Sequence, residues 1–368
     1  MENRAHLHQC AEISGHEEKT HNFIVEVLQS LNPTKLHTHV GGWGVMAEFG
    51  FPKPGKTYLF RADIDAVGLQ AETVRHCCGH DGHTAILLDF AAKLSVNPLP
   101  EGRVLLLFQP SEENGQGAKA ILESGILRDQ VIDLAFALHN IPGFPLDSIL
   151  CKSGSFTCAV LSCEMRFSGK VAHASEPEKS ISPQDAIFGI VAGIQSLQNT
   201  DFSSDEFFLA TLVELHIGEE TYGVAPGNGL LRWTFRAKTN TVLQEKIKMI
   251  ESFSRQAVSQ TQGLAFSFRY LEAFYANENN AFAVELIAKA AGNCGLEFFE
   301  LKEGFRWGED FGVLTQVIPG AMFGLGAGEN CPPLHAPDYD FPDALIEVGS
   351  RMFYEIASIL ASDAKPQD

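Results

Sequence analysis

The sequence predicts an α/β protein in which a mostly parallel, layered sheet is interrupted by a smaller inserted α+β domain. The first 150 residues alternate between helix-like and strand-like segments, which is typical of a parallel sheet. Near Ser155 the pattern changes to alternating strands separated by long helices. The length of 368 residues also exceeds that of a usual single domain. We therefore expect a catalytic domain made of residues 1–155 and 271–368, with residues 156–270 inserted as a second domain.

The elements of the first domain are indicated by the spacing of apolar residues. The segment His21–Leu31 has the periodicity of an amphipathic helix. Short apolar runs bounded by turn residues predict buried strands at Tyr58–Val67, Val104–Phe108 and Leu134–Leu138. Between the first two strands, Thr84–Leu94 is mostly apolar and predicts a buried helix. This alternation predicts βα units whose strands run parallel.

The inserted domain is predicted from six consecutive elements. They are a strand at Leu161–Phe167, a helix at Ser182–Leu197, strands at Phe207–His216 and Leu230–Arg236, a helix at Val242–Ser259 and a strand near Phe266–Tyr270. The order strand–helix–strand–strand–helix–strand is that of a ferredoxin-like α+β domain. The first domain then resumes with apolar segments at Ala281–Ala291, Gly308–Leu314 and Ala321–Gly328.

The composition excludes several classes of protein. The formal charge is −19 and the chain carries no basic tract, which argues against nucleic acid and anionic membranes as partners. No apolar stretch approaches the roughly 20 residues that span a bilayer, and the N-terminus lacks the apolar core of a secretion signal. Eight scattered cysteines are then expected to be reduced thiols, and a cytoplasmic location is expected.

Polar residues follow the three predicted strands of the first domain. Asp63 and Asp65 come at the end of the first strand, Glu112 and Glu113 follow the second, and His139 follows the third. Taken singly, a Glu-Glu pair is usually a solvated turn, and a strand-end histidine is usually a hydrogen-bonded edge residue. Ligands of open α/β sheets bind at the carboxyl ends of the strands. Their shared position at one edge of the sheet therefore favours a common site.

The segment His76–His83 places six side chains able to bind metal or protons in eight positions. Within it, Cys78 and His80 flank a glycine, so one tight turn can present two ligands. Thiolate and imidazole suit zinc and related first-row metals. A further histidine, His335, stands in a loop held by prolines. These residues predict a metal site, without deciding whether the metal is structural or catalytic.

With these motifs in order along nearly the whole chain, the sequence resembles the M20 metallopeptidase family, specifically its amidohydrolase branch. That branch includes hippurate hydrolases, N-acyl amino acid amidohydrolases and indole-acetyl-amino-acid hydrolases. The resemblance rests on Arg4–His8, Glu17–Thr20, Arg61–Ala66, His76–His83, Phe108–Glu113, Leu138-His139, Gly169–His173, Glu309–Phe311 and Leu334–Pro337.

The resemblance implies a ligand set for two divalent metal ions. These ligands are Cys78, His80, Glu113, His139 and His335. It also implies that Glu112 is the general base. The physical logic agrees, because two metals can activate a shared water and polarise an amide carbonyl, while a nearby carboxylate takes the proton. The donor types favour zinc, cobalt or nickel, and the carboxylate also admits manganese.

Three aspartates are predicted to support the metal ligands from behind. Asp63, Asp65 and Asp81 could accept the second N–H of metal-bound imidazoles. Asp81 has an equally good alternative, since it stands where a side chain would cap the helix that starts near Gly82.

In the inserted domain, the resemblance implies that His173 reaches into a cleft, in its own or a partner subunit, to stabilise the oxyanion. A surface histidine is the alternative. Arg232 and Arg236 are four residues apart on a predicted strand and hence share a face, from which either could clamp a substrate carboxylate. An exposed sheet face explains them nearly as well. The resemblance also suggests a homodimer formed through this domain, although nothing in the composition requires one.

We therefore predict a metal-dependent amidohydrolase that splits N-acyl or N-aroyl amino acids, or short peptides, with a metal-activated water. A dipeptidase or aminoacylase with the same machinery is the close alternative. A non-catalytic metal- or ligand-binding protein is the alternative of another class, and a structural zinc module is disfavoured because the ligands are far apart in sequence. The sequence departs from the family pattern in a short segment Val67–Arg75, in Gly223 in place of an asparagine, and in His8–Glu12, where an early His-Pro-Glu element is altered. The first two leave substrate choice open.

Overall fold

In the computed structural model, which describes residues 2–68 and 73–362, the chain divides into two compact units. The first contains residues Met1–Phe156, Asn277–Gly304 and Glu309–Asp368, and the second contains Thr157–Ala276 and Phe305–Gly308. Residues 271–276 and 305–308, which the sequence assigned to the first domain, thus belong to the second unit. Segment 305–308 joins it through a bridge between Thr157 and Phe305.

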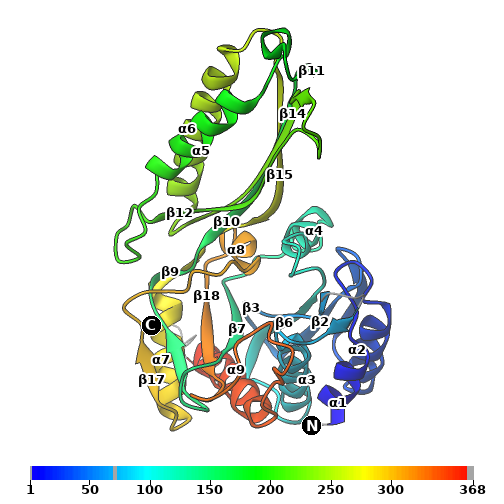
Figure 1. Ribbon diagram of the computed structural model, residues 1–368. Helices are drawn as coiled ribbons and strands as arrows, with labels where there is room; N and C mark the ends of the chain where they lie inside the picture. The colour runs from blue at the N-terminus through cyan, green and yellow to red at the C-terminus, as the bar shows by residue number, and fades with distance from the viewer. Residues whose placement is uncertain (1, 69–72, 363–368) are drawn as a thin grey trace. The chain divides into compact units, whose positions relative to one another are not determined.

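Within its described residues, the first unit is built on an eight-stranded sheet (Figure 1). In sheet order the strands are β1 (Lys35–Val40), β2 (Gly44–Gly50), β6 (Glu101–Gln109), β3 (Lys53–Asp63), β7 (Leu134–Ile141), β18 (Gly320–Gly326), β8 (Ile149–Cys151) and β17 (Phe298–Glu300). The central strands β6, β3, β7 and β18 run parallel. At the margins, β2 is antiparallel to β6 and β8 is antiparallel to β18. The prediction of a mostly parallel layered sheet is therefore confirmed.

Helices cover this sheet and bury its central strands. They are α1 (Glu2–Gln9), α2 (Glu18–Ser30), α3 (His80–Val96), α4 (Gly117–Glu123), α7 (Ala281–Asn293), α8 (Phe311–Thr315) and α9 (Ala344–Ser362). Helices α3 and α9 pack against each other and on β3 and β6 (Figure 1). Every residue of β7 is buried, as expected of a central strand whose two faces are both covered. The predicted strand Tyr58–Val67 is shifted in the structure, where β3 begins at Lys53 and ends at Asp63.

The second unit contains a four-stranded antiparallel sheet with two long helices. Its strands, in sheet order, are β12 (Phe208–Ile217), β14 (Asn228–Ala237), β10 (Ala159–Ser168) and β15 (Ala265–Phe274). The helices are α5 (Gln184–Ser196) and α6 (Asn240–Ser259). Buried residues alternate along β14, as expected for a sheet with one face packed on helices and one face exposed. The chain order β10–α5–β12–β14–α6–β15 confirms the predicted ferredoxin-like arrangement.

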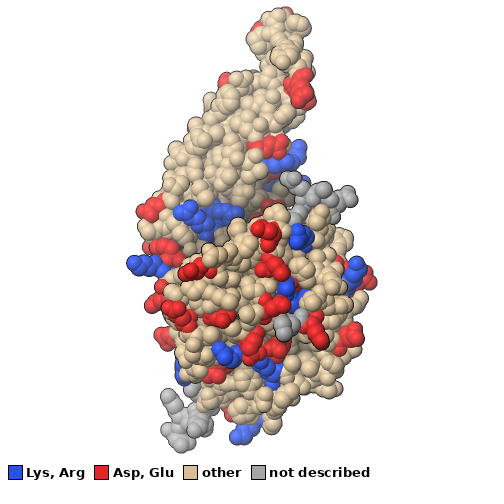
Figure 2. All heavy atoms as spheres, turned by 60° about the horizontal axis from the view of Figure 1, so that its bottom comes forward, with Lys and Arg blue, Asp and Glu red and all other residues tan. Residues whose placement is uncertain are grey.

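Short elements complete the chain. They are the pairs β4 (Val67–Gly68) with β5 (Val74–Arg75), β9 (Gly154–Thr157) with β16 (Asn277–Asn279) and β11 (Ala172–His173) with β13 (Val224–Ala225), and a 3-10 helix, η2 (Pro177–Lys179). Among the described residues, no helix is long and apolar enough to cross a membrane. On the face shown in Figure 2, basic side chains are interspersed with carboxylates.

Candidate metal centre and active site

The predicted site residues of the first unit lie at the carboxyl ends of its parallel strands. Asp63 ends β3 and is paired in register with Gln109, which ends β6. His139 lies near the end of β7 and is paired with Gly324 of β18. Since adjacent parallel strands end at the same edge of the sheet, the loops that follow them converge there.

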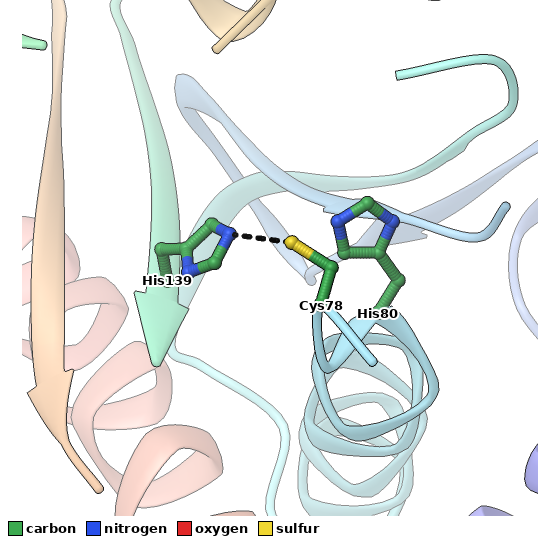
Figure 3. Close-up of side chains that lie close together, drawn as sticks. All are labelled: Cys78, His80 and His139. Carbon is green, nitrogen blue, oxygen red and sulfur yellow. Dashed lines mark hydrogen bonds between the residues drawn. The ribbon is translucent and has the colours of Figure 1, made fainter. Parts of the chain in front are cut away.

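Cys78, His80 and His139 form the centre of this convergence (Figure 3). The Cys78 Sγ lies 3.6 Å from the His139 Nε2, and the ligand atoms of all three residues lie within 4.8 Å of one another. Cys78 precedes α3, His80 opens it, and His139 comes from β7. All three side chains are buried. A thiol and two imidazoles at this spacing are a donor set suited to a first-row divalent metal.

Glycine at position 79 makes this turn possible. Gly79 adopts a φ of +97°, a left-handed conformation that side chains disfavour. A Cβ there would also lie 2.6 Å from the Asn140 Oδ1. Any larger residue would therefore separate Cys78 from His80 or displace Asn140 from the end of β7.

Two glutamates and a third histidine extend the cluster. The Glu113 Oε1 lies 3.7 Å from the His80 Nε2 and 3.8 Å from the His335 Nε2. Glu113 thus belongs to two metal-competent groups, one with Cys78 and His335 and one with His80 and Glu112. The structure therefore brings together all five predicted ligands and the predicted base. The groups overlap through shared members, as expected of neighbouring metal positions.

The two buried histidines each turn the Nδ1 towards a backbone carbonyl oxygen. The Nδ1 of His80 lies 3.0 Å from the Asp65 carbonyl oxygen, and the Nδ1 of His139 lies 2.9 Å from the Asn140 carbonyl oxygen. Each Nδ1 must donate, because a carbonyl only accepts, so the Nε2 is the atom with which the neutral form of each imidazole would bind a metal. Among the described residues, the His80 Nε2 and the Glu113 Oε1 are buried without a hydrogen-bond partner. Buried polar atoms rarely stay unpaired, and these two fit a bound cation.

The electrostatics of the cluster also fit a cation. Burial raises the pKa of the Cys78 thiol and the pKa of the Glu112 carboxyl well above their ordinary values. Burial likewise raises the pKa of Glu113 to about 7, and lowers the pKa of His139 well below its ordinary value. In the absence of metal, burial thus favours the protonated forms of these acids. A divalent cation binds the deprotonated forms and so displaces those protons.

The three predicted supporting aspartates differ in their contacts. Asp65 supports His80 through its backbone carbonyl, and its Oδ1 lies 3.3 Å from the same Nδ1. Asp63 lies 2.7 Å from the His83 Nδ1 and 3.8 Å from the His80 Nε2. Asp81 instead contacts α1, where its Oδ2 lies 2.8 Å from the His8 Nδ1, and its Oδ1 accepts the Gly82 N–H. Asp81 therefore anchors the start of α3.

A buried cation that was not predicted lies beside the cluster. Arg61 is fully buried and donates to Gln109, Asp63 and Asp310 at 2.7 to 2.9 Å. Its Nη2 also lies 3.0 Å from the Glu309 Oε1. Arg61 and the Glu309–Phe311 tripeptide were both visible as motifs. Their pairing was not, because the partners are 249 residues apart in sequence.

Two more unpredicted residues orient His83. The His83 Nε2 lies 2.5 Å from the Asn140 Oδ1, and the Asn140 amide donates to the Tyr339 hydroxyl. With Asp63 on its other nitrogen, His83 has partners on both sides of its ring. It therefore holds the carboxyl ends of β3 and β7 together.

The predicted site residues of the second unit have local partners. His173 is exposed in β11, and its Nδ1 lies 2.7 Å from the Ser175 Oγ. Arg232 is paired with Glu164 and Glu214, and Arg236 donates to the Arg306 carbonyl oxygen. The proposed roles of His173 and of the two arginines remain predictions.

The structure describes Gly223 fully and the segment Val67–Arg75 only in part. The segment Val67–Arg75 begins and ends in the short strands β4 and β5, and its residues 69–72 lie outside the described residues. Gly223 is exposed, and a Cβ there would meet no atom of the described residues within 4 Å. A side chain would therefore fit locally at this position.

Comparisons with known proteins agree with this geometry. The model of peptidase family M20/M25/M40 matches residues 59–358. The N-acetylcysteine deacetylase of Bacillus subtilis is 27% identical over 98% of this chain and 97% of its own length. The N-acetyldiaminopimelate deacetylase of Lactobacillus acidophilus is 27% identical over 94% of each chain. The crystal structure of a dinuclear metal-binding M20 peptidase from B. subtilis superposes with a TM-score of 0.82, at 24% identity, covering 98% of this chain and 97% of that one.

Proposed function

The chain belongs to peptidase family M20/M25/M40 and is a metal-dependent hydrolase of amide C–N bonds, and we propose that it cleaves N-acyl amino acids with Glu112 as the general base. The observation that carries the proposal is a pair of buried atoms in one cluster of ligand groups, the His80 Nε2 and the Glu113 Oε1, which lie 3.7 Å apart and have no hydrogen-bond partner among the described residues. The similar proteins named as deacetylases of N-acetyl amino acids support the substrate class.

Cys78, His80, Glu113, His139 and His335 are the residues that would hold two divalent metal ions. The dinuclear site named for the similar B. subtilis peptidase supports that number. When bound, such ions acidify a water molecule and polarise the substrate carbonyl. Zinc, manganese, cobalt and nickel all suit this mixture of thiolate, imidazole and carboxylate donors.

The two adjacent glutamates have different surroundings, and this supports different roles. Glu113 faces His80 and His335, as a ligand should. Glu112 lies beside Glu309 and Asp310, and accepts a 3.4 Å hydrogen bond from the Asp310 N–H. Burial and the charge of Glu309 raise the pKa of Glu112, which makes it a stronger base. A carboxylate of raised pKa suits a group that must accept a proton and release it again.

The proposed reaction transfers one proton through Glu112. The water oxygen attacks the amide carbon, and Glu112 accepts the proton that the water loses. Glu112 then passes this proton to the amide nitrogen, and the C–N bond breaks to release a carboxylic acid and an amino acid. We propose that His173 donates a hydrogen bond to the carbonyl oxygen as negative charge develops there. Because its Nδ1 is beside Ser175, its Nε2 is the nitrogen left for the substrate.

The test is amino acid release from N-acetyl, N-benzoyl and dipeptide substrates by protein stripped of metal and reloaded with zinc, manganese, cobalt or nickel. Metal-restored release from one acyl class would identify both metal and substrate. Glu112→Gln should keep metal binding and lose about 10²–10⁴-fold in kcat. Glu123→Gln, an exposed carboxylate on α4, is the matched control and should retain activity.

Two outcomes would contradict the proposal in different ways. Full activity of Glu112→Gln would remove Glu112 from the base role while leaving the hydrolase intact. A folded protein that binds two ions but cleaves none of the N-acyl substrates would favour the dipeptidase if dipeptides are cleaved. It would favour a binding protein if none of the panel is cleaved.

A further inference from the structure

A short segment near the N-terminus lies directly behind the proposed metal ligands. Residues 12–17 belong to the connection between α1 and α2, more than 60 positions before Cys78 in the sequence. The Ala66 N–H donates to the Glu12 carbonyl at 2.8 Å, and Ile13 forms a bridge with Ala66. The Glu12 carboxylate also accepts the N–H groups of Lys19 and Thr20 at the start of α2. The segment is thus fixed both to the chain after β3 and to a helix.

Ser14 holds a carboxylate that contacts two of the proposed ligand residues. Its Oγ donates to the Asp65 Oδ2 at 2.7 Å, and the same oxygen accepts the Glu113 N–H at 3.0 Å. Asp65 also faces the His80 Nδ1 with its carbonyl and its Oδ1. Asp65 is fully buried, and Ser14, which is half-buried, is the side chain that donates to it from the segment before α2. The Ser14 hydroxyl therefore sets the orientation of a side chain shared by His80 and Glu113.

Glu17 binds the backbone of Ser111, the residue that precedes Glu112 and Glu113. Its fully buried carboxylate accepts the Ser111 N–H at 2.8 Å and the Gly15 N–H at 2.9 Å through the Oε1. The Ser111 Oγ also lies 3.2 Å from this oxygen. Ser111 has a φ of +57°, a left-handed conformation that costs a non-glycine residue about 1–3 kcal/mol unless its surroundings impose it. The charged acceptor on Glu17 supplies that constraint, and the direction of the chain at Ser111 decides where Glu112 and Glu113 point.

We propose that Ser14 and Glu17 are positioning residues of the metal centre, acting through Asp65 and Ser111 respectively. This inference rests on the proposed function, because it assumes that His80 and Glu113 bind metal. Neither residue touches the substrate or the proposed metal positions in this scheme. Partners behind metal ligands fix ligand orientation, and their loss typically weakens metal affinity 10–100-fold. The sequence gives no metal-binding signal at these positions, since neither side chain is a ligand.

The experiment compares Co²⁺ binding by the full chain with binding by two test variants, two matched controls and a rescue variant. Ser14→Ala removes the hydroxyl, and Glu17→Gln keeps the shape but removes the charge that strengthens the hydrogen bonds of the carboxylate. The matched controls are Ser30→Ala, which removes an exposed hydroxyl at the end of α2, and Glu18→Gln, which removes the exposed neighbouring carboxylate. Affinity is measured by competition with a chelator. Ligand geometry is read from the visible absorption bands of bound Co²⁺, including the thiolate-to-cobalt band of Cys78.

Ser14→Ala and Glu17→Gln should each bind Co²⁺ about 10–100-fold more weakly and show altered absorption bands, while both controls match the wild type. Ser14→Thr, which keeps a hydroxyl, should restore affinity and spectrum. At a metal concentration that saturates the wild type, kcat of Ser14→Ala and Glu17→Gln should fall, while KM for the substrate stays nearly unchanged. Should Ser14→Ala not fold, Ser14→Cys gives the same comparison, because a thiol is a weak donor of similar size.

Wild-type affinity and an unchanged spectrum in folded Ser14→Ala (or Ser14→Cys) and Glu17→Gln would overturn the inference. A loss of affinity that Ser14→Thr fails to restore would overturn the role of the Ser14 hydroxyl. Failure of the wild type to bind Co²⁺ would instead overturn the proposed metal centre itself. The two failures are therefore separated by the wild-type measurement.

Discussion

Replacing Arg61 by methionine tests how far the buried ionic cluster stabilises the first unit. Methionine keeps most of the apolar stem of arginine but removes the guanidinium. Its loss leaves Asp63, Glu309 and Asp310 without the cation that they share at 2.7 to 3.0 Å. Removing one partner of a buried ion pair typically costs about 3–5 kcal/mol, because a charge stays buried and uncompensated. For a unit of this size, that loss lowers Tm by roughly 10 °C.

The pH dependence of this loss has a definite sign. Burial and the charge of Glu309 raise the pKa of Asp310 to about 8, and Arg61 opposes that rise. Without Arg61, the pKa of Asp310 in the folded state rises further above its unfolded value. A carboxyl with a raised folded pKa is destabilising as pH rises through that pKa, since the folded state then holds protons that the unfolded state has released. The deficit of Arg61→Met should therefore grow above about pH 8, where Asp310 ionises in the folded wild type but not in the folded variant, and should be larger near pH 9 than near pH 7.

The assay is thermal unfolding of metal-free protein followed by circular dichroism at both pH values. Arg128→Met, at an exposed position of the same unit, is the matched control and should change Tm by no more than about 1 °C. A Tm of Arg61→Met equal to that of the control would refute the stabilising role of the cluster. A deficit that is larger at low pH would refute the assignment of the loss to uncompensated carboxylates.

Three further predictions concern the elements around the site. Gly82→Ala should destabilise by about 1–3 kcal/mol in urea unfolding, because its Cβ would lie 2.4 Å from the Phe341 ring, while Gly292→Ala, with open space around it, should not destabilise. His76 is buried, and desolvation lowers its pKa to about 4. Between about pH 6.5 and 4 the unfolded state therefore binds a proton that the folded state does not, and the protein loses stability as the pH is lowered through this range. His76→Phe should reduce the stability lost between about pH 7 and 5 by about 2 kcal/mol, and an unchanged pH profile would contradict this. Removal of metal by a chelator should lower Tm. Each metal ion, returned at about 100 times its Kd, should restore about 2.7 kcal/mol of the free energy of unfolding. Equal Tm values with and without metal would argue against a site formed only in the folded state.

The central strands and the inserted domain were predictable because their patterns are local. An apolar run such as Val104–Phe108 indicates a strand covered on both faces, whatever its neighbours are. The margins of the sheet were not predicted. Strand β1 shows the burial of an exposed edge, with His37 and His39 among its residues, and so lacks a strong apolar signal. The long helix α9 was also missed, although its buried face follows helical spacing.

The metal ligands were predictable for a different reason. Thiol, imidazole and carboxylate groups carry their chemistry in their identity, and strand ends supply their location. The supporting residues lack both signals. Ser14, Glu17 and Asn140 are ordinary polar residues in sequence, and only the fold places them behind His80, Glu113 and His83. Asp81 shows the converse, because its position in the motif suggested support for the metal while its contacts are with α1.

The charges of the site are unevenly balanced, and this imbalance argues for metal on one side of it. Arg61 compensates Asp63, Glu309 and Asp310 on the side of Glu112. On the other side, the ion pairs that Glu113 makes within the described residues are with two imidazoles, His80 and His335. Burial raises the pKa of Glu113 to about 7 and the pKa of Cys78 well above its ordinary value, so an added positive charge would favour the deprotonated forms of both. Arg61 thus neutralises the carboxylates around Glu112, and bound metal ions would neutralise the deprotonated ligands. Arg61→Met should therefore reduce stability while leaving the thiolate-to-cobalt band of Cys78 in place.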